Sequence, residues 1–378
     1  MWNEENQFSG RPQIVFAGGG TAGHVFPALA VADEMRRRHP QASIRFIGAK
    51  RGLEQRLVPR AGYRLRSLGV AGIQGRGPVG KLVAGASAGW AVVRCLLWLL
   101  ASKPDLVIGV GGYASGPAVL AATLLRRKTM VMEQNHYPGA TNRWLAPRVD
   151  AVCVPSAAAR LRMGDRGIVT GNPVRREFAE IGDPPLGAVP SVLVFGGSRG
   201  ARSINDAMIG AAGPLARHPT PPRLVVQTGR DDAERVGRAF ADYPRDLCSV
   251  VEFIDDMPGR LASADLVVCR AGASTLSELA VAGRASILVP YPFAADDHQR
   301  HNAESMRDAG AARMIVDAEL DGERLARALL ELCADHERLR AMGRAARSLG
   351  RPRATVAIAD VADRLMRGLD PERAADVP

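Results

Sequence analysis

Short apolar runs alternate along the first half of the chain with longer segments of helical length. Each run ends in small residues, as in QIVFAGGG (13–20) and DLVIGVGGY (105–113). The remaining runs of this half are SIRFIGA, TMVMEQN, AVCVPS and GIVTGNP. Strands that alternate with helices indicate βαβ units and a parallel sheet, so we predict one Rossmann-like domain over residues 11–178.

The same pattern restarts after the proline- and glycine-rich stretch EIGDPPLGAVPS (180–191). Its apolar runs are VLVFGGSRG, RLVVQTG, SVVEFID, DLVVCRAGAS, ASILVPYP and RMIVD. We therefore predict a linker over 179–190, a second Rossmann-like domain over 191–345, and a helix over 346–368 that is able to return to the first domain. The predicted fold class is α/β, with two Rossmann-like domains facing one another across a cleft.

Length, charge and cysteine content narrow the class of protein. A chain of 378 residues exceeds one ordinary hydrophobic core. Residues 1–176 hold 25 Lys and Arg against 9 Asp and Glu, a net charge of +16, whereas the remainder is mildly acidic. A basic half attracts an anionic partner. The five cysteines lie far apart without a C-x-x-C pair, and the polar, acid-containing N-terminus is unlike a signal peptide, so we expect a cytoplasmic protein.

Glycine-rich turns follow four of the predicted strands, and such turns suit phosphate groups. Gly18, Gly20 and Gly23 have the G-x-G-x-x-G spacing of a dinucleotide-binding turn. The second predicted strand, however, ends in Gly48, Ala49 and Lys50, where an NAD enzyme carries an acid. An NADP-dependent oxidoreductase therefore remains the alternative. Binding of a dinucleotide cofactor on this turn is the less favoured interpretation of the glycines.

Eight motifs stand in the order found in one family. They are GGGTAGHVFPALA, GGYASGP, EQNHYPGATN, GNPVR, GGSRGA, EFIDDM, AGASTLSELAVAG and DDHQRHNA. The chain resembles the UDP-N-acetylglucosamine–N-acetylmuramyl-(pentapeptide) pyrophosphoryl-undecaprenol N-acetylglucosamine transferases of bacterial cell-wall synthesis. The resemblance implies the glycosyltransferase B-type fold and transfer of GlcNAc from UDP-GlcNAc to lipid I. The product is lipid II, with a β(1→4) bond formed by inversion and with no cofactor.

The resemblance also implies a donor site for UDP-GlcNAc. Ala22 departs from the family, since many members have glycine there. Ile254 is expected to read the uracil through its backbone, and Glu278 to bind the ribose diol. The full set carried over is Thr21, Ala22, Gly23, Asn135, Arg175, Ser198, Ile254, Ala273, Ser274, Thr275, Leu276, Glu278 and Gln299.

An inverting transfer needs a base for the incoming hydroxyl and stabilisation of the leaving diphosphate. His24 follows the first glycine turn and is the first candidate base, with Glu133 second. No two aspartates lie two residues apart, so we expect amides of the glycine turns to replace a metal ion. His298 and His301 are three residues apart, beside Asp296 and Asp297, and this spacing would allow both histidines to bind one zinc ion. Because the sequence offers no third strong ligand, we predict no metal site.

The apolar segment 81–103 invites a membrane interpretation. Arg94 lies inside it, which disfavours a spanning helix. Trp90 and Trp98, with Arg76, Lys81 and Arg94, suit a helix that docks on an anionic leaflet. We expect a peripheral protein on the cytoplasmic face of the bacterial membrane, with lipid I, UDP-GlcNAc and other cell-wall synthesis and division proteins as partners. The basic half shows no nucleic-acid motif, so nucleic acid is not expected.

Overall fold

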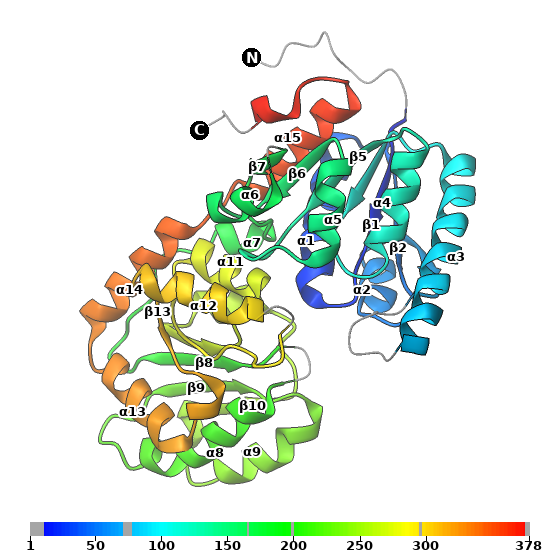
Figure 1. Cartoon of the computed structure of the whole chain (residues 1–378). Coiled ribbons are helices and arrows are strands. Elements are labelled where there is room, and N and C mark those ends of the chain that lie inside the picture. The colour runs from blue at the N-terminus through cyan, green and yellow to red at the C-terminus, as the bar shows by residue number, and fades with distance from the viewer. Residues whose placement is uncertain (1–10, 71–77, 165, 198–199, 295–296, 375–378) are drawn as a thin grey trace. The chain divides into compact units, whose positions relative to one another are not determined.

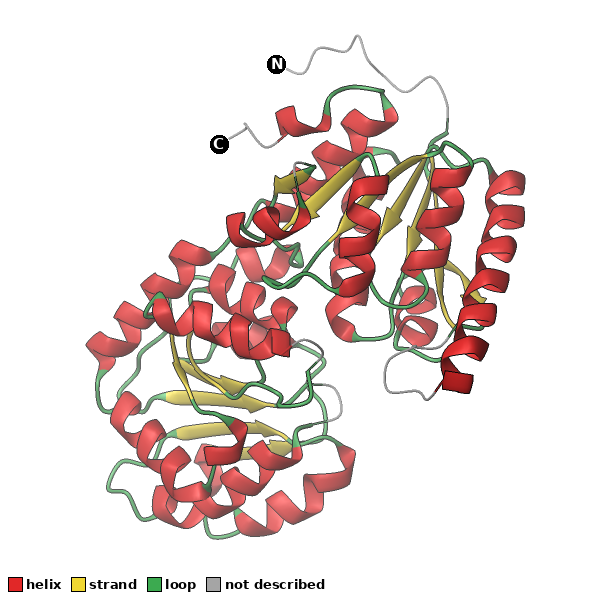
Figure 2. Ribbon diagram, viewed as in Figure 1, coloured by secondary structure: helices red, strands yellow, loops and turns green. Residues whose placement is uncertain are grey.

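The computed structural model describes residues 11–70, 78–164, 166–197, 200–294 and 297–374, and these residues form two compact units. The first unit contains the residues up to Arg175 together with those from Arg353 onward. The second unit is Arg176–Pro352. In each unit helices cover both faces of one parallel sheet (Figure 2).

The sheet of the first unit has seven parallel strands in the order β3-β2-β1-β4-β5-β6-β7. Six of them coincide with the predicted apolar runs, and the edge strand β3 was not predicted. The strands are β1 Gln13–Ala17, β2 Ser43–Ala49, β3 Arg64–Leu68, β4 Leu106–Gly109, β5 Lys128–Met132, β6 Ala151–Val154 and β7 Gly167–Val169.

Two apolar clusters, one on each face of this sheet, form the core of the first unit. One cluster contains side chains of α1, α2 and α15. The other contains side chains of α3, α4, α5 and α6. The helices are α1 Ala22–Arg38, α2 Glu54–Arg60, α3 Pro78–Ser102, α4 Ser115–Leu124, α5 Ala140–Leu145, α6 Ala157–Met163 and α15 Ala354–Met366 (Figure 1).

The C-terminal segment divides between the two units. The predicted helix over 346–368 is two helices, because α14 ends at Leu349 in the second unit and α15 begins at Ala354 in the first. Arg38, at the end of α1, pairs with Asp360 at 2.6 Å and with Asp363 at 2.9 Å on α15. His39 Nε2 lies 2.7 Å from Asp363. These charges fix α15 against α1.

The sheet of the second unit has six parallel strands in the order β10-β9-β8-β11-β12-β13. They are β8 Ser191–Phe195, β9 Arg223–Gln227, β10 Cys248–Val251, β11 Leu266–Cys269, β12 Ala285–Leu288 and β13 Ala312–Met314. The helices are α7 Arg176–Ala179, α8 Arg202–Ala216, α9 Ala233–Ala239, α10 Met257–Ala262, α11 Ala273–Ala282, α12 His298–Asp308, α13 Gly322–Cys333 and α14 His336–Leu349.

The predicted linker 179–190 belongs to the second unit. Phe178 and Ile181 are buried in its core. Asp265 is also buried, and its two carboxylate oxygens accept the amides of Leu186 at 2.7 Å and Ser191 at 2.8 Å. The chain therefore enters the second unit at Arg176, a few residues before the expected boundary at 178.

Strand order determines where ligands can bind. In each sheet the order reverses between two neighbouring strands, β1 and β4 in the first unit and β8 and β11 in the second. Turns at the carboxyl ends of such strands splay apart and form the usual ligand site of an open parallel sheet. The four glycine-rich turns of the sequence follow these four strands.

Candidate active site

Two glycine-rich turns lie against one another at the switch point of the first unit. Residues 18–21, the first glycine turn, follow β1, and residues 110–114 follow β4. The amide of Gly19 donates to the carbonyl of Gly111 at 3.2 Å. A Cβ added to Gly18 would lie 2.2 Å from that carbonyl oxygen, and one on Gly112 would lie 2.4 Å from the oxygen of Gly19. Only glycine permits this approach.

A protein carboxylate occupies the inner side of the first glycine turn. The amide of Gly20 donates to Glu54 Oε2 at 2.7 Å, and Glu54 is almost fully buried. Gly20 is the second glycine of the G-x-G-x-x-G spacing, whose backbone approaches the pyrophosphate in dinucleotide-binding proteins. Because its amide already serves Glu54, the turn is poorly suited to that ligand. This contact disfavours the oxidoreductase alternative.

His24 lies in the first turn of α1, within reach of both glycine turns. Its Nδ1 is 3.1 Å from the hydroxyl oxygen of Thr21. Its Nε2 lies against Gly111, where an added Cβ would come within 2.8 Å of that nitrogen. The imidazole is therefore held from two sides while remaining partly exposed. A histidine held in this way can move a proton.

Glu133 organises the loop after β5. Its Oε1 accepts the amides of Gln134 at 3.0 Å and Asn135 at 2.8 Å, and Asn135 Nδ2 at 3.1 Å. Its Oε2 accepts the amide of Gly139 at 3.1 Å and Asn142 Nδ2 at 2.9 Å. Five donors thus surround a carboxylate that is only 3% exposed. A buried carboxylate whose oxygens already accept five hydrogen bonds holds the loop in place. It is a poor candidate for the base that accepts a proton from the acceptor hydroxyl.

Arg175 is the last residue of the first unit before the chain crosses over. Its guanidinium carbon lies 5.4 Å from the centre of the Phe26 ring on α1. Among the predicted donor residues of this unit, Thr21, Ala22, Gly23 and Arg175 therefore lie on or beside α1. Asn135 lies in the loop held by Glu133.

The second unit repeats the arrangement at β8 and β11. Gly197 has φ +94, and an added Cβ there would meet nothing within 4 Å. Gly200 has φ +76, and its Cβ would lie 1.8 Å from the carbonyl oxygen of Thr228. Ser198, the predicted diphosphate contact between them, lies outside the described residues. The turn requires glycine on its inner side and is open at Gly197.

The predicted phosphate and ribose contacts form the start of α11. Gly272 is the N-cap of this helix and carries no side chain, and the first turn contains no acidic residue. Ala273, Ser274 and Thr275 therefore present the positive end of the helix dipole at the switch point, a favourable place for an anion. Leu276 is buried in the core, and Glu278 lies two residues further along the helix.

Arg270 was not predicted as part of the site, although it connects three of its segments. Its guanidinium donates to Ser203 Oγ on α8 at 2.8 Å and to the carbonyls of Val289 and Pro290, both at 3.2 Å. It also pairs with Asp317. A single arginine directly after the apolar strand LVVC is the signal that identifies it. Arg270 holds the turns after β8, β11 and β12 together.

The remaining predicted residues of the second unit lie in the loop after β10 and in helix α12. Ile254 is buried between β10 and α10. Gln299 Oε1 accepts the amide of Tyr291 at 3.0 Å and so ties α12 to the preceding loop. His301 Nδ1 lies 3.4 Å from Glu304, and Asp296 is outside the described residues. Among the described residues, no group of three or more His, Cys, Asp or Glu is placed to hold a metal ion.

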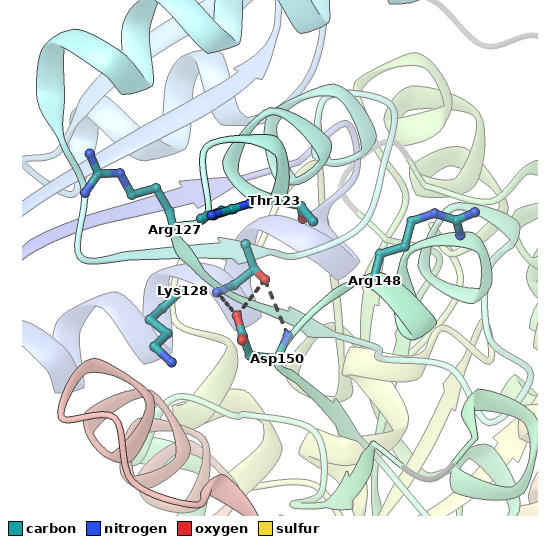
Figure 3. Close-up of a pocket in the computed structure, with 7 residues that line it drawn as sticks. Thr123, Arg127, Lys128, Arg148 and Asp150 are labelled. Atoms are coloured by element: carbon teal, nitrogen blue, oxygen red, sulfur yellow. Dashed lines mark hydrogen bonds between the residues drawn. The ribbon is translucent and has the colours of Figure 1, made fainter.

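A separate pocket of about 270 Å³ lies at the amino ends of strands β5 and β6, away from the carboxyl ends where the glycine turns lie. Thr123, Arg126, Arg127, Lys128, Thr129, Arg148 and Asp150 line it. Asp150 is engaged by the amide and hydroxyl of Thr129, at 2.8 and 3.0 Å. The side chains of Arg127, Lys128 and Arg148 point in different directions (Figure 3). The pocket is not part of the glycine-turn site.

The predicted membrane residues differ in exposure. Trp90 on α3 is 65% exposed. Trp98 was expected to contribute to an exposed patch, but it is partly buried against the core. The guanidinium carbons of Arg94 and Arg66 lie 4.8 and 5.2 Å from its ring centre. Arg76 and the side chain of Lys81 lie outside the described part of the chain. No described helix is both long and apolar enough to cross a membrane.

Two parallel-sheet units with glycine turns at both switch points have the architecture of the glycosyltransferase B-type fold. Models of the glycosyltransferase family 28 N-terminal and C-terminal domains match residues 14–154 and 191–365. The chain belongs to glycosyltransferase family 28. The predicted α/β fold class, with two parallel-sheet domains, and the predicted family are both confirmed.

Named relatives share nearly the whole length of the chain. It is 44% identical over 357 residues to the UDP-N-acetylglucosamine–N-acetylmuramyl-(pentapeptide) pyrophosphoryl-undecaprenol N-acetylglucosamine transferase of Myxococcus xanthus, covering 94% of this chain and 93% of that protein. It is 45% identical to the protein of the same name from Syntrophotalea carbinolica, covering 94% and 97%.

Solved structures show the same fold. The crystal structure of Acinetobacter baumannii MurG superposes with a TM-score of 0.76 at 30% identity, covering 93% of this chain and 99% of that one. A UDP-GlcNAc 2-epimerase from Neisseria meningitidis, bound to UDP-GlcNAc, gives 0.63 at 12% identity, covering 94% and 100%. At such low identity the second likeness concerns the fold alone.

Proposed function

We propose that this chain transfers N-acetylglucosamine from UDP-N-acetylglucosamine to the C4 hydroxyl of the N-acetylmuramyl group of lipid I. The product is lipid II, with a new β(1→4) bond. The observation that carries the proposal is the 44–45% identity, over 94% of the chain, to two relatives that bear this transferase name. Nothing in the comparisons favours the oxidoreductase alternative.

The second unit supplies most of the donor site in this proposal. The start of α11, from Ala273 to Leu276, receives the diphosphate and ribose side of the nucleotide, because helix amides and the helix dipole stabilise negative charge. Glu278 binds the ribose diol, and the backbone of Ile254 reads the uracil. Gln299 addresses the sugar hydroxyls, and Ser198 and Arg175 contact the diphosphate and uridine side.

His24 is the proposed base. If Nδ1–H donates to Thr21 Oγ across the 3.1 Å contact, Nε2 keeps its lone pair and accepts the proton of the acceptor hydroxyl. The hydroxyl oxygen then attacks the anomeric carbon from the face opposite the diphosphate, which inverts the configuration. UDP leaves, and its charge is stabilised by the amides at the start of α11.

Purified protein with UDP-[³H]GlcNAc and a short-chain lipid I analogue tests this function. We expect labelled disaccharide product and UDP in equal amounts, and a fall in turnover of roughly 100-fold or more for His24→Ala with little change in UDP affinity. Conversion of the donor to its 2-epimer without transfer, or binding of NADPH in place of UDP-GlcNAc, would contradict the proposal.

We also propose that α3 docks the first unit on an anionic membrane surface. Trp90, Val93, Leu97 and Leu100 are all exposed, and their spacing places them on one face of the helix. The opposite face, which includes Cys95, packs in the core. An exposed apolar stripe of this kind marks an interaction surface. The positive charge of the first half supplies attraction of about 1 kcal/mol per cation near an anionic leaflet.

Vesicle binding tests this surface. Trp90→Ser with Leu97→Ser should weaken binding to phosphatidylglycerol vesicles several-fold and lower activity on a long-chain acceptor, while activity on a short soluble acceptor persists. Leu161→Ser is the matched control, since Leu161 is 87% exposed on α6 of the same unit. Arg76→Glu with Lys81→Glu should act in the same direction. Equal loss on both acceptors, or unchanged vesicle binding, would contradict the docking role.

A further inference from the structure

The carboxylate of Glu54 lies in a chamber made by three glycines. A Cβ added to Gly19 would lie 2.5 Å from Glu54 Cδ, one on Gly48 would lie 2.6 Å from Cγ, and one on Gly52 would lie 2.2 Å from Oε2. These glycines come from three segments, the turn after β1, strand β2, and the turn between β2 and α2. Any side chain at these positions would displace the carboxylate. The chamber is therefore shaped for Glu54, which is 1% exposed.

Glu54 connects the first glycine turn to the neighbouring strand. Its Oε2 accepts the amide of Gly20 at 2.7 Å and its Oε1 accepts the amide of Ala49 at 2.9 Å. Both distances are in the range of charge-assisted hydrogen bonds. Backbone bonds reinforce the connection, from Gly18 to the carbonyl of Ile47 at 2.9 Å and from Leu53 to that of Gly20 at 3.4 Å. The turn after β1 is thus held to the end of β2 and the start of α2.

The first glycine turn depends on such contacts because its own backbone is permissive. Gly18, Gly19 and Gly20 are consecutive and have φ values of +141, +137 and +94. Glycines lose more conformational freedom on folding than any other residue, so this turn gains its single conformation from outside. A Cβ on Gly20 would meet nothing within 4 Å. Glu54 therefore holds Gly20 through its amide.

Gly20 directly precedes the residues proposed for chemistry. Thr21 follows it, and the Thr21 hydroxyl lies 3.1 Å from Nδ1 of His24. We propose that Glu54 is a positioning residue of the transfer reaction, which fixes the glycine turn and through it the orientation of the His24 imidazole. This inference rests on the proposed function, in which His24 is the base. Since the donor nucleotide is assigned mainly to the second unit, loss of Glu54 should lower kcat and leave UDP affinity almost unchanged.

The direct test compares Glu54→Gln with Asp105→Asn. The glutamine keeps the size of the side chain but directs an N–H₂ group toward one of the two amides. Asp105 is the matched control, because its carboxylate accepts the amide of Gln13 at 2.8 Å at the opposite end of the same strand β1. We expect kcat to fall roughly 10- to 100-fold for Glu54→Gln, with the Kd for UDP within about twofold of wild type. Asp105→Asn should keep the wild-type kcat.

A double-mutant cycle separates positioning from a general effect on stability. In the His24→Ala background, Glu54→Gln should lower kcat less than about threefold, because the residue through which it acts is already missing. Additive losses in the two backgrounds would overturn the inference, as would a wild-type kcat for Glu54→Gln. If Glu54→Gln does not fold, Glu54→Asp serves in its place, since it keeps the charge but reaches only one amide. A wild-type kcat for that variant would likewise overturn it.

Nuclear magnetic resonance of the ligand-free protein tests the clamp without reference to activity. The Gly20 amide proton should be shifted downfield and protected from exchange in the wild type, and both properties should be lost in Glu54→Gln. An unchanged Gly20 resonance would overturn the inference whatever reaction the enzyme catalyses. Absence of transfer by the wild-type protein would instead reject the proposed function.

Discussion

Glu133→Gln distinguishes a structural carboxylate from a catalytic one. The wild-type side chain receives three donors on Oε1 and two on Oε2. A glutamine must turn its N–H₂ group toward one of these two groups of donors. Fewer hydrogen bonds are lost if the N–H₂ group replaces Oε2, which accepts from Gly139 and Asn142. Asn142 Nδ2 also donates to the carbonyl of Met132 at 3.1 Å, so that side chain keeps a partner.

The expected cost follows from this count. One buried donor left without its acceptor costs about 1–3 kcal/mol, and the bonds that remain lose their charge assistance, so we expect a loss of about 2–4 kcal/mol in the free energy of unfolding. Turnover measured at a temperature where the variant is folded should fall less than about tenfold, since a missing general base usually costs 100-fold or more.

Urea unfolding and steady-state kinetics of the same preparation provide the assay. Asp265→Asn is the control, because Asp265 is equally buried and accepts two backbone amides in the second unit. It should lose comparable stability and retain turnover. A Glu133→Gln protein with wild-type stability and a loss of turnover beyond 100-fold would refute the structural role and make Glu133 the base, above all if His24→Ala stayed active.

Three further predictions concern the donor, the C-terminal helix and the thiols. Glu278→Ala should weaken UDP binding by about 1.5–3 kcal/mol, and calorimetry in excess chelator should show that wild-type binding needs no metal ion; unchanged affinity in the variant would remove Glu278 from the site. Burial alone would raise the pKa of Asp363, but hydrogen bonds from His39 and Arg38 outweigh it and hold that pKa below its ordinary value. Such a carboxyl stabilises the fold above its unfolded pKa of about 3.9 and loses this effect as the pH falls through the lower folded value. Asp363→Asn should therefore destabilise the protein at pH 7 in urea unfolding and match the wild type in acid, whereas an equal difference at all pH values would argue against the ion pair. Burial raises the pKa of Cys95 to about 12, so iodoacetamide at pH 7 should leave this thiol unmodified until the protein unfolds.

The sequence predicted the layered architecture because buried parallel strands are continuous apolar runs. Strand β3 was not predicted, because RLRSL has two arginines and a serine among its five residues and is therefore not a continuous apolar run. The break between α14 and α15 was also missed, although Pro352 stands there. Helical periodicity continues on both sides of it, and no local signal says that the two helices pack in different units.

The glycine turns of the site could be located from the sequence, but the side chains that hold them could not. Glu54 begins a short helix with no motif around it, and its chamber is assembled from three segments that meet only in the fold. Arg270 donates a hydrogen bond to Ser203, which is far away in the sequence, so the sequence alone does not show that the two segments are joined. Trp98 was expected to be exposed because an exposed and a partly buried tryptophan look alike in the sequence of an apolar helix.

The configuration of the product tests the central claim most directly. Purified protein would be incubated with UDP-GlcNAc and a short-chain lipid I analogue, and the isolated product examined by ¹H NMR. We predict a disaccharide whose new anomeric proton has the large coupling of a β-linkage and whose N-acetylmuramyl C4 resonance is shifted by glycosylation. An α-linked product, or a donor consumed without any disaccharide, would contradict the assignment of this chain as an inverting N-acetylglucosaminyltransferase acting on lipid I.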